Sequence, residues 1–266
     1  MGFLLSTLYG RNQPITEDAG ADMVQRKLKQ VTSISDSELE EYVRLAGTAF
    51  GDDDASMLAL LGGDISLRDE LLAAMFRAVL LEGKVYVVEC NSQVVSVALW
   101  FRQPIGLFKT DAQRALGYDE WFKKLPKELQ HWWTVDYPEQ LKGYAKKIIS
   151  QEHLHHSREA AYKELVKKDC CTLNKASVHS RGPSEWDKMW FCNLMVTDLK
   201  QQGRGHATFL MNQLTAKARA SGEILGLSTG TEINVPKYES MGFRERGRII
   251  LHSLINEVPC VWMTKA

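Results

Sequence analysis

The residues with the plainest chemical meaning lie in the segment VTDLKQQGRGHATFLMNQL, between Val196 and Leu214. Gly203 and Gly205 precede a run of apolar residues at helical spacing, and Arg204 stands between them. Glycines before a helix let backbone N–H groups converge on an anion, and the helix N-terminus adds partial positive charge. The segment therefore predicts a site for a ligand that carries phosphate.

Three kinds of phosphate-binding loop compete for this segment with an ordinary glycine-rich turn. A P-loop needs GKS or GKT at the start of the helix, and neither is present. A dinucleotide fingerprint that begins at Gly203 would have Thr208 in place of its third glycine and too little chain after it for a doubly wound sheet. The third pattern, QxxGxA, fits Gln202, Gly205 and Ala207.

A second motif lies downstream, in the segment NVPKYESMGF from Asn234 to Phe243. Together, the two segments resemble the GNAT superfamily of acetyl-CoA-dependent acetyltransferases. That superfamily has a Q/RxxGxG/A signature after a strand that ends in valine, here Val196, followed by an N-x-x-x-Y-E-x-x-G-F segment. The stretches ALWF and MWF also resemble the puromycin acetyltransferase-like branch and its fungal relatives.

The resemblance implies that acetyl-CoA is the co-substrate. The backbone of Met195, Val196 and Thr197 would pair with pantetheine as though it were an added strand, and the pyrophosphate would lie against the glycine loop. Arg204 and Lys200 would offset its charge, and Ala207 would keep the first helical turn free of bulk. The residues implied to bind the cofactor in and after the loop are Gln202, Gly203, Arg204, Gly205, His206, Ala207 and Asn234.

Acetyl transfer to an amine requires removal of a proton from the ammonium, stabilisation of an oxyanion and a proton for the departing thiolate. By resemblance, Tyr238 is the acid and a backbone N–H near Leu194 or Met195 is the oxyanion donor. Many relatives have a carboxylate on the strand before the loop, but this strand reads MWFCNLMV and has no acid. Glu185 and Asp187 lie just before it and are the candidate bases, acting through water, with solvated surface residues as the alternative.

His179 is a further candidate that would act through water, and an amine that is already weakly basic would need no dedicated base. Cys192 raises a rival mechanism in which a thiol carries the acetyl group. A cysteine on a core strand is more often a small hydrophobic residue, and no partner pattern of histidine and acid accompanies it.

The elements that must position these residues follow from apolar spacing. An edge strand is expected within 23–34, followed by a helix with Asp36 as its N-cap, a second helix over 66–81, and a hairpin around Asn91 and Ser92. Strands over 189–197 and 224–229, a helix from Gly205, a short helix to Met241 and two final strands complete an α/β pattern with a mixed sheet. Residues 1–22 read as an N-terminal arm before a domain over 23–266.

Residues 102–183 differ from their flanks in having helical patterns and clustered aromatic residues, which we expect to be mostly core. The resemblance makes the fold a GNAT-like, mostly antiparallel central sheet flanked by helices, with this helical insertion between the third and fourth strands. A single domain of this kind is compatible with the chain's 266 residues and their 44% apolar content.

The composition narrows the classes of partner. Lysine plus arginine equals aspartate plus glutamate at 33 each, so neither nucleic acid nor a membrane surface is an expected partner. The cysteines are odd in number and are not spaced as metal ligands, and neither are His153, His155 and His156. We therefore expect reduced thiols, a cytoplasmic location and no metal.

The sequence thus predicts an N-acetyltransferase that moves acetyl from acetyl-CoA directly to the amine of a small molecule. One alternative is a protein or peptide acetyltransferase, against which the absent strand glutamate and the bulky insertion argue. The other is a module that binds coenzyme A without turnover. The acceptor and the oligomeric state stay open.

Overall fold

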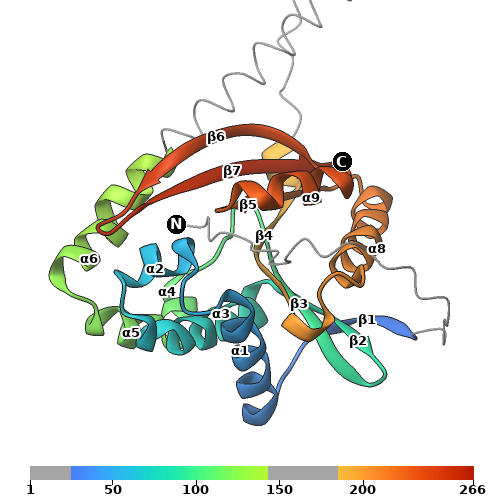
Figure 1. Cartoon of the computed structure of the whole chain (residues 1–266), viewed down its shortest axis with the longest axis horizontal. Coiled ribbons are helices and arrows are strands. Elements are labelled where there is room, and N and C mark those ends of the chain that lie inside the picture. Colours follow the sequence, from blue (N-terminus) through green and yellow to red (C-terminus); the bar gives the residue numbers. More distant parts are fainter. Residues whose placement is uncertain (1–24, 143–184) are drawn as a thin grey trace, which may run out of the picture.

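The computed structural model describes residues 25–142 and 185–266, which form a seven-stranded sheet in the order β1-β2-β3-β4-β5-β7-β6 (Figure 1). Its neighbouring strands are antiparallel except for β4 and β5, which are parallel. This is the mixed, mostly antiparallel sheet that was expected. The strands are β1 (Arg26–Val31), β2 (Lys84–Cys90), β3 (Gln93–Arg102), β4 (Met189–Thr197), β5 (Ile224–Thr229), β6 (Arg244–His252) and β7 (Glu257–Lys265).

Helices cover both faces of the sheet (Figure 1). The α-helices are α1 (Asp36–Phe50), α2 (Ala55–Leu61), α3 (Arg68–Glu82), α4 (Asp111–Arg114), α5 (Tyr118–Lys124), α6 (Lys127–His131), α8 (His206–Ala220) and α9 (Val235–Ser240). Shorter turns are η1 (Ile65–Leu67), η3 (Glu185–Lys188), η4 (Leu199–Gln201), η5 (Glu232–Asn234) and the π-helical η2 (Trp132–Asp136). The predicted arm 1–22, the histidines at 153, 155, 156 and 179, and the rest of the insertion lie outside the described residues.

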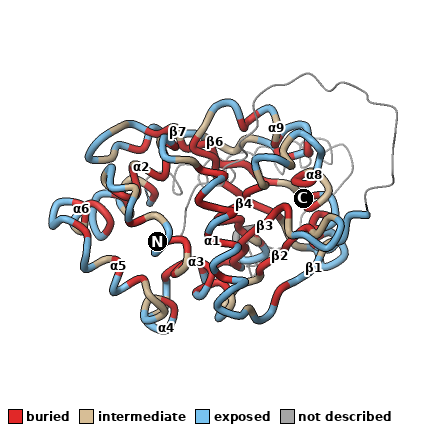
Figure 2. Tube along the Cα trace, turned by 60° about the horizontal axis from the view of Figure 1, so that its bottom comes forward, coloured by how far each residue is buried: buried red, intermediate tan, exposed pale blue. Residues whose placement is uncertain are grey.

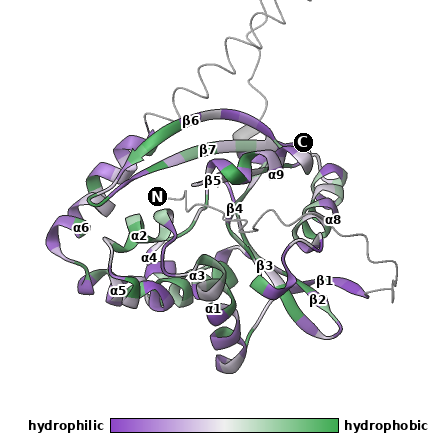
Figure 3. Ribbon diagram, viewed as in Figure 1, coloured by the Kyte–Doolittle hydropathy of each residue, from purple (hydrophilic) through white to green (hydrophobic). Residues whose placement is uncertain are grey.

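The core has two parts, one on each face of the sheet. Alternate residues of β2 and β3, such as Val87 and Leu99, pack with α1, α2 and α3, whereas Val88 and Ala98 pack with α8 and α9. Figure 2 shows the buried residues concentrated along the central strands. Figure 3 shows that β1, at the edge of the sheet, is mostly hydrophilic, which is how exposed strand edges avoid pairing with other chains.

Local sequence explains where the elements begin and turn. Ser35 caps α1 in a capping box with Glu38, so the cap lies one residue before the expected Asp36. The bonds from Ser35 hold the pKa of Glu38 below its usual value. Asn91 and Ser92 join β2 to β3 with φ of 50° and 64°, the left-handed pair that a tight hairpin requires. The predicted hairpin is confirmed.

The described part of the segment between β3 and β4 contains α4, α5, α6 and η2, and its tryptophans belong to the core. The indole N–H of Trp121 donates to the carbonyl of Leu67 at 3.1 Å, and that of Trp133 donates to the carbonyl of Leu60 at 2.9 Å. Trp132 donates to the carbonyl of His252 at 2.8 Å. These bonds fasten the segment to η1, α2 and β6.

Candidate active site

The two parallel strands at the centre of the sheet separate halfway along their length. β4 and β5 pair from Met189 with Ile224 to Cys192 with Leu227, and their register ends there. The pairing of β4 with β3 shifts at the same point, which leaves Asn193 as an extra residue in a β-bulge. Among the described residues, none pairs with the β5-facing edge of β4 over 193–197, and an extended ligand can pair with it.

The open edge leads into the glycine loop. The side-chain amide of Gln202 donates to the carbonyl of Thr197 at 3.1 Å and closes the loop onto the end of β4. Gly203 and Gly205 both have φ of +75°, and a Cβ atom at Gly203 would meet nothing within 4 Å. This left-handed backbone explains both glycines.

Gly205 is the N-cap of α8, and no side chain of the described residues caps the helix there. Its carbonyl accepts the first helical hydrogen bond, from the N–H of Phe209 at 2.9 Å. The N–H groups of His206, Ala207 and Thr208 precede that bond and have no partner within the helix. They provide an anion site at the positive end of the helix dipole.

An arginine that the motifs do not reveal completes this site. Arg26, on β1, donates from Nη2 to the carbonyl of Arg204 at 2.8 Å. Its Nη1 lies 3.8 Å from the position that a Cβ atom on Gly205 would occupy. Arg26 is 178 residues from Arg204 in the chain. No local pattern of spacing indicates this contact, because the strand order of the sheet creates it.

His206 lies beneath the loop at 2% exposure, and its ring nitrogens have no hydrogen-bond partner among the described residues. Burial lowers the pKa of His206, and the charges of Arg26 and Arg204 lower it further. The imidazole is therefore neutral at pH 7, and the positive charge beside the helix start comes from the two arginines.

Tyr238 and Asn234 lie in the segment after β5. Tyr238 on α9 is 0% exposed, its ring meets that of Phe243 edge to face at 5.8 Å, and it shares a buried cluster with Met195 of β4. The structure thus gathers the predicted acid and the predicted pantetheine-pairing strand on the same side of the sheet. Asn234 is buried, and its Oδ1 accepts from Nζ of Lys237 at 3.2 Å. Burial lowers the pKa of Lys237.

The two candidate bases lie at the other end of β4. Glu185 and Asp187 belong to η3, and Asp187 is exposed. The bulge at Asn193 is about 13 Å of strand beyond Met189, where β4 begins after η3. The structure does not bring these carboxylates to the open edge of β4. Their role as the catalytic base therefore stays a prediction without support from the geometry.

A small cavity of about 10 Å³ borders the bulge on the face covered by α1, α2 and α3. Asn193, Leu194 and Ser56 line it together with apolar residues, and its lining includes no carboxylate. Asp54 lies nearby in sequence and is buried, but its Oδ1 caps α2 by accepting from the N–H of Met57 at 2.7 Å. This capping bond gives Asp54 a structural role at the start of α2.

Cys192 has the surroundings of a packing residue. Its side chain is fully buried, and its thiol donates to the carbonyl of Leu194 at 3.3 Å. Burial raises the pKa of the Cys192 thiol. Because only the thiolate is a good nucleophile, this environment opposes the rival mechanism in which the cysteine carries the acetyl group.

Within 25–142 and 185–266, no cluster of three or more histidine, cysteine or acidic side chains is placed to hold a metal ion. In the same part of the chain, no helix has the length and apolarity needed to cross a bilayer.

Comparison with solved structures identifies the fold. A histone acetyltransferase HPA2 and related acetyltransferase from Corynebacterium glutamicum superposes with a TM-score of 0.50 at 15% identity, over 90% of this chain and 95% of that one. The chain therefore has the fold of the GNAT acetyltransferases, which the two motifs predicted.

Other acetyltransferases superpose less closely. A ribosomal-protein-alanine N-acetyltransferase from Brucella melitensis gives a TM-score of 0.44 at 13% identity, over 90% of this chain and 98% of that one. The polyamine N-acetyltransferase of Drosophila melanogaster gives 0.42 at 12%, over 91% and 99%. No family profile and no curated protein sequence matches the chain.

Proposed function

We propose that this protein binds acetyl-CoA and transfers its acetyl group to the amine of a small molecule. The observation that carries the proposal is the continuity between the open edge of β4 and the uncapped start of α8. Pantetheine pairs with the backbone of Met195, Val196 and Thr197, and the pyrophosphate accepts from the N–H groups at the helix start. Arg26 and Arg204 offset its charge.

The proposed reaction is a direct transfer. The amine nitrogen attacks the thioester carbon, the C–S bond breaks, and the hydroxyl of Tyr238 gives its proton to the sulfur. A backbone N–H of β4 near Leu194 or Met195 stabilises the oxyanion. The proton of the amine passes to water.

The choice of a small acceptor over a polypeptide rests on the sequence, because β4 lacks the strand glutamate of lysine acetyltransferases. The cavity of about 10 Å³ beside the bulge has room for no more than about one water molecule and does not identify the acceptor. The superposed structures give no support to the puromycin acetyltransferase-like branch, and a cytoplasmic location remains an expectation from composition.

A coenzyme A-binding protein without turnover is the second candidate, because β4 has no carboxylate from Met189 to Thr197. The two candidates separate when the protein is incubated with acetyl-CoA, a thiol reagent and a panel of amines that includes polyamines, aromatic amines and lysine peptides. Thiol release that depends on a small amine supports the proposal. Release only with peptides would make the protein a peptide acetyltransferase, and binding without release would make it a sensor.

Acetyl-CoA at a hundredfold excess over its dissociation constant should stabilise the protein by about 2.7 kcal/mol. For a domain of this size the melting temperature should rise by about 5–10 °C. NAD, which also carries a pyrophosphate but lacks pantetheine, is the matched control and should produce no shift. Stabilisation by NAD with none by acetyl-CoA would mean that the glycine loop has been misread. Differential scanning fluorimetry measures both.

Replacing Arg26 by glutamine should weaken acetyl-CoA binding by about fivefold, because a positive charge beside the pyrophosphate is lost. Since the site is exposed to solvent, that charge contributes only about 1 kcal/mol to the binding free energy. Lys27→Gln is the matched control, since Lys27 is an exposed cation on the same strand with its side chain on the opposite face. Isothermal titration calorimetry gives both affinities. Equal affinities would place Arg26 outside the cofactor site.

A further inference from the structure

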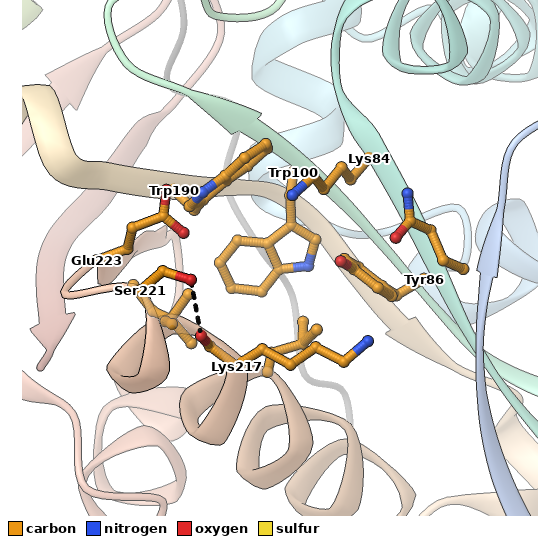
Figure 4. A pocket seen from close by; sticks show the side chains of 11 residues that line it. Lys84, Tyr86, Trp100, Trp190, Lys217, Ser221 and Glu223 are labelled. Carbon is orange, nitrogen blue, oxygen red and sulfur yellow. Dashed lines mark hydrogen bonds between the residues drawn. The ribbon is translucent and has the colours of Figure 1, made fainter.

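A second cavity, of about 270 Å³, lies between the sheet and the C-terminal half of α8 (Figure 4). Three cross-strand pairs form its base: Gln30 with Tyr86, Lys84 with Trp100, and Trp190 with Leu225. Leu214, Lys217 and Ala218 of α8 cover it, and Ser221 and Glu223 close one end. The glycine loop is at the other end of α8, about 14 Å along the helix from Leu214, the lining residue of α8 nearest to it. The cavity is therefore separate from the proposed cofactor site.

Aromatic rings dominate this cavity. Figure 4 shows the indole of Trp100 in the middle of the floor, between Trp190 and Tyr86. Trp100 is 1% exposed, and its Nε1 has no hydrogen-bond acceptor in the described part of the chain. By contrast, the indole N–H groups of Trp121 and Trp133 each donate to a carbonyl. A buried N–H without an acceptor is unfavourable, so a ligand oxygen that enters beside Tyr86 would satisfy it.

The charges around the cavity favour an anion. Nζ of Lys84 lies 4.0 Å from the centre of the Trp190 ring, and Nζ of Lys217 lies 5.3 Å from that of Tyr86. The carboxylate of Glu223 lies 3.6 Å from Nη2 of Arg102, which offsets its charge. Burial raises the pKa of Tyr86, and the charge of Glu223 raises it further, so this phenol stays neutral. Two lysines thus leave the rim positive.

We propose that this cavity binds a planar aromatic carboxylate of one or two rings. The ring packs on Trp100 and Trp190, because flat apolar faces line the floor. The carboxylate accepts the indole N–H of Trp100, and the ammonium groups of Lys84 and Lys217 offset its charge. The volume suits a ligand near the small end of the usual range for such pockets.

The test uses isothermal titration calorimetry of the whole chain with 2-naphthoate and with 2-naphthamide, which has the same rings but no charge. One molecule of 2-naphthoate should bind, at least fivefold more tightly than 2-naphthamide. Saturating acetyl-CoA should leave that affinity unchanged. No saturable binding, equal affinity for the two probes, or displacement by acetyl-CoA would each overturn the proposal.

Variants locate the binding in this cavity. Lys84→Gln combined with Lys217→Gln should weaken 2-naphthoate binding about tenfold and leave 2-naphthamide unchanged, whereas Lys123→Gln on α5 is the control and should alter neither. Trp100→Phe keeps a ring but removes the donor, and should weaken 2-naphthoate about tenfold. If Trp100→Phe does not fold, the lysine pair decides the question, since both side chains lie at the rim. Wild-type affinity in the double lysine variant would contradict the proposal.

Discussion

The Gly205→Glu protein is expected to fold yet to bind acetyl-CoA more than ~100-fold more weakly, a loss of about 2.7 kcal/mol or more. Gly205 is the N-cap of α8, and a Cβ atom there would meet only Nη1 of Arg26, at 3.8 Å. The glutamate would therefore extend into the space beside the helix start, and its carboxylate would compete with the pyrophosphate for the same N–H groups. Calorimetric titration with acetyl-CoA measures the loss.

The control must separate loss of the site from backbone strain, because φ at Gly205 is +75° and a side chain in that conformation costs about 1–2 kcal/mol. Gly222 also has a left-handed φ, of +62°, and nothing within 4 Å of its Cβ position. It lies just beyond the other end of α8, so Gly222→Glu introduces the same residue and a similar strain away from the loop. It should keep wild-type affinity. Tight acetyl-CoA binding by Gly205→Glu would remove the loop from the site.

Tyr238→Phe is expected to lower kcat by ~10² while leaving the affinity for acetyl-CoA unchanged. The phenylalanine preserves the buried ring and its edge-to-face contact with Phe243, so the fold has no reason to change. Only the proton donor for the departing thiolate is lost. This decrease in kcat is at the low end of the range expected for loss of a general acid, because a thiolate is already a tolerable leaving group. Initial rates of thiol release with a good amine acceptor and saturating cofactor provide kcat.

Tyr118 on α5 is the matched control for this substitution. It is buried among Phe108, Trp121 and Phe122, away from β4 and β5. Tyr118→Phe should keep kcat within about twofold, because it removes a hydroxyl from a ring that lies away from the open edge of β4. The Tyr238→Phe variant should also lose any decline in kcat at high pH that comes from ionisation of the acid. Wild-type turnover in Tyr238→Phe would show that the thiolate leaves without this proton.

The two expected losses distinguish binding from chemistry. Gly205→Glu should abolish cofactor stabilisation and turnover together, whereas Tyr238→Phe should keep the former and lose most of the latter. Because Gly205 lies at the helix start and Tyr238 on α9, one result does not depend on the other. A protein that only senses coenzyme A would show the first effect and have no turnover on which to show the second.

Local features of the fold were predictable because they depend on residues close together in the chain. Strand β4 and strand β5 have the predicted bounds, and the Asn91–Ser92 turn forms because those two residues tolerate positive φ. The predicted N-cap of α1 was wrong by one residue, and the reason is also local. Ser35 and Asp36 are both good caps, and the capping box with Glu38 selects the serine.

The chemistry of the glycine loop was also local. Glycine adopts a left-handed conformation without strain, so Gly203 and Gly205 mark the loop before α8 in the sequence itself. The candidate bases Glu185 and Asp187 were predicted only because they lie close to β4 in the sequence. Asp187 is ten residues before Thr197, but the intervening strand β4 is extended and separates its two ends, Met189 and Thr197, by about 26 Å. Short separation in sequence becomes long separation in space along a strand.

The order of the helices and strands and the backbone of the glycine loop could thus be predicted from residues close together in the chain, whereas the GNAT-like sheet and the roles of Met195, Val196 and Thr197 were implied by the resemblance. Neither kind of reasoning revealed which side chains distant in the sequence join them. Strand order brings Arg26 of β1 to the carbonyl of Arg204, and the bulge at Asn193 ends the pairing of β4 with β5. Cross-strand register places Lys84 beside Trp100 and builds the second cavity. Such contacts depend on register, which a single sequence specifies only through the packing of the whole sheet.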